Sequence, residues 1–122
     1  MEERRQFVRL DTRVEVTYSI LPSGTSQRTV AKNIGGGGIC FFLEQPVPQG
    51  TRLQVAVKLP EREQPVDFTA EVIRCETYEI IGKTERQRVV EADVRFLEIS
   101  PTDQEAVMQH VVLRMQPGRH GG

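Results

Sequence analysis

The sequence predicts an all-β domain with one terminal helix, built as a six-stranded antiparallel barrel. Apolar residues alternate with polar ones in most segments between turns, which is the period of a strand with one face in water. Turn residues return about every ten residues, a spacing typical of small barrels. A helical spacing of apolar residues begins only after Ile99.

The length of 122 residues fits one domain. Hydrophobic residues make up 38% and charged residues 27%, a globular balance without a polar low-complexity tract. No internal repeat divides the chain. We therefore expect an N-terminal arm over residues 1–11, a barrel with its helix over 12–116, and a frayed tail over 117–122.

The first two strands are predicted as a hairpin. Apolar residues alternate from Thr12 to Ile20, and Leu21 to Gly24 reads as a turn. Thr25 to Ile34 is polar and β-branched, so it is expected to return as the second strand. The glycine run from Gly35 to Gly38 ends it.

Four more strands and a helix follow. The strands are expected at Ile39 to Leu43, Leu53 to Leu59, Val66 towards Cys75, and Val90 to Phe96. Ser100 to Asp103 then supplies a helix cap with a proline in the first turn. The helix is expected to end at Pro117 and Gly118.

The charge pattern argues against a nucleic-acid partner. The net charge is −1, whereas proteins that bind long polyanions usually carry a strong basic excess. A reader of single strands would also need exposed aromatic residues. Trp is absent and Tyr18 and Tyr78 lie far apart, which leaves Phe7 as the one aromatic residue of interest. We expect neither DNA nor RNA as a partner.

The cellular location is expected to be the cytoplasm. Cys40 and Cys75 are too few for a disulfide framework, so they are expected to be reduced, buried thiols. The N-terminus has no secretory signal. The longest apolar run, Ile39 to Leu43, is far too short for a membrane span.

Catalysis, a metal and a cofactor are not expected. The two histidines, His110 and His120, have no metal-ligand neighbour at a usable spacing. His110 is expected on the helix surface or half-buried. Neither cysteine lies in the sequence context of a nucleophile.

The first candidate for ligand chemistry is Arg5-Gln6-Phe7-Val8-Arg9, which follows Arg4 and precedes the first strand. Two guanidiniums four residues apart converge on one ligand if the segment turns. Guanidinium pairs with phosphate and with the O6/N7 edge of guanine, and it stacks on purines. Taken alone, the segment could equally be a solvated basic arm.

The second candidate is the segment Asn33 to Gly38, at a strand end. Glycines let a ligand come close to backbone N–H groups. The amide of Asn33 could bind a base edge. Taken alone, this segment could also be an ordinary glycine-rich turn.

Together the two segments resemble the pattern of the PilZ domain family, an RxxxR before the first strand and a (D/N)xSxxG at the end of the second. Here these are Arg5 to Arg9 and Asn33 to Gly38. Gly37 to Phe41 and Ala92 to Ser100 also resemble that family's third and last strands. The resemblance covers about residues 4 to 115.

The resemblance implies a PilZ-like barrel whose N-terminal arm clamps the second messenger cyclic di-GMP. Arg5 and Arg9 would contact phosphate and guanine. Gly35 stands where the family usually has serine, so one hydroxyl hydrogen bond is absent. Such a bond contributes about 0.5 to 1.5 kcal/mol, so affinity would fall several-fold. The residues expected to bind the ligand are Arg4, Arg5, Arg9, Asn33, Gly35, Gly36, Gly37 and Gly38.

The function implied is a receptor whose arm changes position on binding and signals to a protein partner in motility, pilus, secretion or exopolysaccharide machinery. The alternative is an adaptor that works without ligand, because some members of the family have lost the ligand residues. This sequence keeps Arg5, Arg9, Asn33 and Gly38, which favours the receptor.

Overall fold

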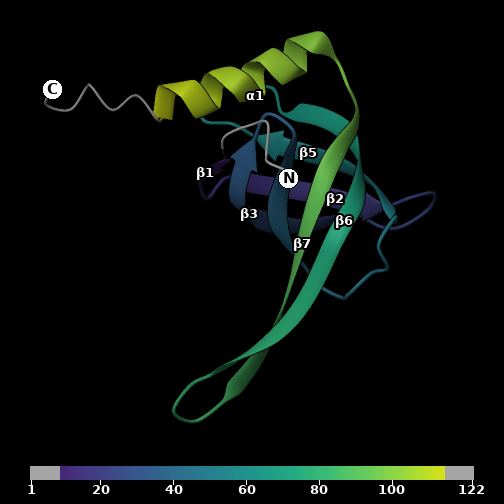
Figure 1. The fold of residues 1–122 in the computed structure, drawn as a ribbon, viewed down its shortest axis with the longest axis vertical. Coiled ribbons are helices and arrows are strands. Elements are labelled where there is room, and N and C mark those ends of the chain that lie inside the picture. Colours follow the sequence, from purple (N-terminus) through teal and green to yellow (C-terminus); the bar gives the residue numbers. More distant parts are fainter. Residues whose placement is uncertain (1–8, 115–122) are drawn as a thin grey trace, which may run out of the picture.

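The computed structural model describes residues 9–114 (Figure 1). This part of the chain forms seven strands and one helix. The elements are β1 (Arg9–Asp11), β2 (Glu15–Ile20), β3 (Gln27–Gly35), β4 (Gly38–Leu43), β5 (Arg52–Lys58), β6 (Val66–Ile81), β7 (Arg86–Ile99) and α1 (Pro101–Arg114).

Six of the strands close into an antiparallel barrel. The order of neighbours is β3, β2, β5, β6, β7 and β4, and pairing of β4 with β3 closes the ring. The predicted fold class is therefore confirmed. The strand β1 was not predicted. It lies outside the ring and pairs with the end of β3, and three residues are too few to show a strand period.

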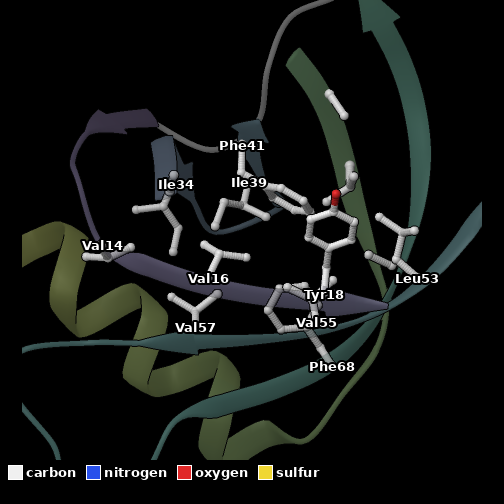
Figure 2. Close-up of a cluster of buried hydrophobic side chains, with 14 of the residues drawn as sticks. Val14, Val16, Tyr18, Ile34, Ile39, Phe41, Leu53, Val55, Val57 and Phe68 are labelled. Atoms are coloured by element: carbon white, nitrogen blue, oxygen red, sulfur yellow. The ribbon is translucent and has the colours of Figure 1, made fainter. Parts of the chain in front are cut away.

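The alternating apolar residues fill the inside of the barrel, as Figure 2 shows for a cluster of them. Burying one such side chain contributes about 1.5 to 3 kcal/mol. Ile20 departs from the pattern, because it is 38% exposed at the end of β2. Residues exposed by 2% or less include Val16, Ile34, Ile39, Phe41, Leu53, Val55, Val57, Phe68, Val72 and Val94.

The hairpin of β6 and β7 extends well beyond the barrel as a twisted ribbon (Figure 1). The sequence predicted strand only towards Cys75 and from Val90, yet the two strands stay paired as far as Ile81 and Arg86. Both faces of the ribbon meet water, so it carries no alternation of apolar and polar residues. Ile81 is 70% exposed.

The helix α1 lies at the opposite end of the barrel from the ribbon (Figure 1). The predicted cap is confirmed, because Ser100 Oγ accepts a hydrogen bond from the backbone N–H of Asp103 at 3.0 Å. Val107 and Val111 are buried with the core. Within residues 9–114, no helix is both long and apolar enough to cross a membrane.

His110 was expected on the helix surface or half-buried, and this prediction is wrong, since it is 2% exposed. Its Nδ1 lies 2.8 Å from Oε1 of Glu61, in the turn between β5 and β6. Arg114 Nη2 donates to the same carboxylate at 3.0 Å. Partial burial of the Glu61 carboxyl raises its pKa, but the hydrogen bonds from His110 and Arg114 outweigh this and hold the pKa below its ordinary value.

We expect Glu61→Gln to lower the free energy of unfolding by about 1 to 2 kcal/mol at neutral pH, since the variant loses the charge that both helix residues bind. Because the pKa of Glu61 is lowered by folding, its contribution is present above about pH 4.5 and is lost as the pH falls further. Urea unfolding of both proteins at pH 7 and about pH 3 measures this, with Glu63→Gln in the same turn as control. An equal difference at both pH values would contradict it.

Candidate functional site

The two candidate segments meet at the outer strand β1. This strand pairs with β3 in the register Arg9 with Gly35 and Asp11 with Asn33. The guanidinium of Arg9 donates a hydrogen bond to Oδ1 of Asn33. The segments are 24 positions apart in the sequence, so the fold brings an arginine of one onto the amide of the other. Arg9 is half-buried there.

The glycine run forms the turn from β3 to β4, and neighbouring elements hold its backbone. The carbonyl oxygen of Gly36 accepts a hydrogen bond from Gln104 Nε2 of α1 at 3.2 Å. The carbonyl oxygen of Gly37 accepts one from the backbone N–H of Phe96 on β7 at 3.2 Å. The turn is therefore tied to the helix and to the barrel wall.

Gly38 has no room for a side chain. A Cβ built there would overlap the carbonyl oxygen of Val94 and lie 3.1 Å from Cα of Arg95, both on β7. At Gly35, by contrast, the question is whether the backbone φ requires glycine. Among residues 9–114, the glycine with positive φ is Gly50, so the backbone at Gly35 is not in the left-handed region and its φ is one that serine adopts.

Asp93 and Arg74 belong to the same site, and neither was among the predicted ligand residues. Arg9 Nη1 lies 3.4 Å from Oδ1 of Asp93. Arg74 Nη2 lies 2.9 Å from Oδ2 of Asp93, so each carboxylate oxygen holds one arginine. Asp93 lies on β7 between the buried residues Ala92 and Val94, so the alternation of this strand places it on the outer face. The alternation carried no signal that a β6 arginine would reach it.

A second polar cluster lies next to this one on the outside of the barrel. Glu91 accepts hydrogen bonds from Tyr78 Oη at 2.7 Å and from Lys32 Nζ at 3.2 Å. Cys40 Sγ donates to it at 3.4 Å. Burial, followed by the charges of Asp93 and Glu91, raises the pKa of the Cys40 thiol to about 12, so it stays protonated at neutral pH.

The described part of the predicted site is thus assembled from Arg9, Asn33 and the glycine run Gly35 to Gly38. Arg4 and Arg5 lie outside the described residues. Within residues 9–114, no three His, Cys, Asp or Glu side chains gather to hold a metal ion. A hollow of about 320 Å³ between α1 and the turn after β5 is lined by other residues, so it is separate from this site.

The sequence that forms this barrel and site matches a known domain family. The sequence matches the PilZ domain over residues 3–113. The chain belongs to the PilZ domain family. The resemblance drawn from the two motifs is therefore confirmed, and among curated proteins no sequence matches the chain.

Solved structures of other proteins share this fold. The PilZ domain of YcgR from Escherichia coli, solved with c-di-GMP, has a TM-score of 0.70 and 21% identity, covering 92% of this chain and 91% of that one. The inhibitor of motility MotI/DgrA of Bacillus subtilis has a TM-score of 0.73 and 28% identity, covering 93% of this chain and 51% of its own. The K. pneumonia MrkH–c-di-GMP complex has a TM-score of 0.73 and 15% identity, and the match covers 97% of this chain and 56% of MrkH. The chain thus spans about half the length of MotI and MrkH.

We expect Gly38→Ala to destabilise the PilZ barrel by about 1 to 3 kcal/mol or more, because its Cβ would meet backbone atoms of β7 that cannot turn away. Gly50→Ala provides a contrast, since nothing lies within 4 Å of its Cβ and the cost there arises from the positive φ alone. Thermal unfolding of the two variants measures both effects. A Gly38→Ala protein as stable as the wild type would show that β4 and β7 can separate at this point.

Proposed function

We propose that this PilZ domain binds cyclic di-GMP through Arg9, Asn33 and the glycine turn. The observation that supports the proposal most is the hydrogen bond between Arg9 and Asn33, which joins the two motifs at one place. The PilZ family generally binds c-di-GMP. The YcgR PilZ domain and MrkH, which share the fold, are solved with c-di-GMP.

Each group in the site suits one part of this ligand. The guanidinium of Arg9 can pair with a phosphate or with the O6/N7 edge of guanine. The amide of Asn33 both donates and accepts, so it can bind a second base edge. Arg5 lies four positions before Arg9, and Arg4 precedes it. These two are proposed to complete the phosphate contacts.

A phosphate can bind Arg9 while Asp93 stays beside it, because a guanidinium has five N–H donors and the ion pair between Arg9 and Asp93 is weak. Arg9 and Asp93 lie 3.4 Å apart with side-chain exposures of 23% and 20%. Partly exposed ion pairs contribute about 0 to 1 kcal/mol. A charge-assisted hydrogen bond to phosphate contributes about 1.5 to 3 kcal/mol. The phosphate contact of Arg9 therefore outweighs any weakening of its ion pair with Asp93.

We expect Arg9→Ala and Asn33→Ala each to weaken binding of cyclic di-GMP, Arg9→Ala by roughly tenfold to a hundredfold because a charge-assisted contact is lost. Isothermal titration calorimetry measures this, and wild-type binding should weaken as salt rises. Arg28→Ala is the control, since Arg28 is exposed at the other end of β3. No heat for the wild type near millimolar ligand would remove the receptor function and leave a ligand-independent adaptor.

The proposal includes a switch in the N-terminal arm, residues 1–11, ahead of a barrel and helix over 12–116 and a tail over 117–122. Arg9 to Asp11 pair with β3, so the change of position is assigned to the residues before Arg9. Ordering backbone costs about 1 to 2 kcal/mol per residue. Contacts of Arg4 and Arg5 with two phosphates can offset that cost.

The output is assigned to a protein partner, because the proposed receptor is not an enzyme and acts by binding alone. The docked arm would present a new surface to it. The partner is proposed to belong to motility, pilus, secretion or exopolysaccharide machinery. The proposed location is the cytoplasm, where cyclic di-GMP is available, and neither DNA nor RNA is proposed as a partner.

We expect saturating cyclic di-GMP to protect the peptide bonds after Arg4 and Arg5 from trypsin before it protects any other site, because those side chains would be bound. Mass spectrometry of timed digests measures the cleavage. The bond after Arg86 on the distant ribbon serves as internal control and should be cut at the same rate with and without ligand. Equal cleavage of the arm in both conditions would remove the switch while leaving binding intact.

A further inference from the structure

Asp93 is the acidic group at the centre of the candidate site. It faces outward from β7 and its side chain is 20% exposed, so a ligand can reach it. One oxygen lies next to Arg9 and the other next to Arg74. A carboxylate has about four lone-pair sites on its two oxygens, so Asp93 can accept further hydrogen bonds besides those of the two arginines. The nearby Cys40 thiol, a weak donor, is the protein group that competes for them.

We propose that Asp93 binds the Watson–Crick edge of one guanine and so selects guanine over adenine. This inference rests on the proposed function, since it assigns a specificity residue to the same site. A site for a phosphate needs no carboxylate, because a carboxylate repels the anion. A carboxylate between two arginines is useful to a ligand that brings hydrogen-bond donors together with its phosphates.

The chemistry of the two purines explains the selection. Guanine presents N1–H and N2–H₂ side by side, and both oxygens of a carboxylate can accept from them together. Adenine presents an acceptor at N1, which would face a carboxylate oxygen without a hydrogen between them. A site built to bind particular donors strongly rejects an analogue that lacks them, since its polar groups are then left unpaired.

Glu91 is not available for the same task, although it lies two positions away on the same face of β7. Its carboxylate already accepts from Lys32, Tyr78 and Cys40. Its side chain is also less exposed, at 11%. Glu91 therefore offers a matched control, a carboxylate in the same strand whose acceptor sites are filled by the protein.

Asp93 could instead act only by holding Arg9 in place, and base preference separates the two roles. A residue that merely positions Arg9 leaves the ratio of affinities for cyclic di-GMP and cyclic di-IMP unchanged, because the two ligands carry the same phosphates and the same O6/N7 base edge. A residue that reads guanine changes the ratio of affinities between bases. The amide of asparagine, which both donates and accepts, suits adenine better than a carboxylate does.

The experiment titrates wild type, Asp93→Asn, Asp93→Ala and Glu91→Gln with three probes: cyclic di-GMP, cyclic di-AMP, and cyclic di-IMP, whose base keeps N1–H but lacks the N2 amine. Wild type should prefer cyclic di-GMP, then cyclic di-IMP, then cyclic di-AMP. Asp93→Asn should lose roughly tenfold to a hundredfold for cyclic di-GMP and bind cyclic di-AMP as well as or better than before. Glu91→Gln should keep the wild-type order, and urea unfolding checks that each variant is folded.

Two results would overturn the inference by itself. One is an unchanged ratio of the affinities for the three probes in Asp93→Asn. The other is an equal loss for cyclic di-GMP and cyclic di-IMP in Asp93→Ala, which is the result expected of a residue that only holds Arg9. A wild type that binds none of the three would instead remove the proposed function, and this inference with it.

Discussion

The close approach of β4 and β7 at Gly38 is the constraint on which both the barrel and its site depend. A side chain there would overlap the backbone of Val94, so the ring closes only with glycine at this position. The same approach fixes the turn that leads into β4, because Gly37 accepts a hydrogen bond from Phe96 on β7. Closing the barrel and shaping the glycine turn are thus one requirement, and the turn is where the candidate site lies.

The strand β7 contributes to both the core and the candidate site, because its side chains point alternately into the barrel and out of it. Val90, Ala92 and Val94 are buried inside the barrel, while Glu91 and Asp93 lie between them on the outer face. A shift of β7 by one residue would exchange the two faces and bury both carboxylates. The apolar core therefore fixes the register that holds Asp93 opposite Arg9 and Arg74.

The sequence predicted the barrel and the helix cap, because alternation and capping residues are local signals. It grouped Arg9 with Asn33 only through the resemblance of their two motifs to the PilZ pattern. It did not predict the ribbon beyond Cys75, where both faces meet water and the alternation ends. The burial of His110 also went unpredicted, since it depends on Glu61, a residue of a distant turn. The role of Arg74 likewise depends on a contact between two strands. The local sequence pattern predicts where strands and helices lie. Which side chains meet across the barrel depends on how those strands and helices pack.

The charges of the site bear on what kind of ligand it suits. Arg9 and Arg74 carry two positive charges and Asp93 one negative charge, which leaves a net charge of one among the three. A free phosphate would be attracted by the two guanidiniums and repelled by the carboxylate at a similar distance. A ligand with donors as well as phosphates satisfies all three groups at once. Near balance of charge thus reduces affinity for simple anions, and it favours a molecule in which a phosphate and a guanine edge are held at a fixed distance.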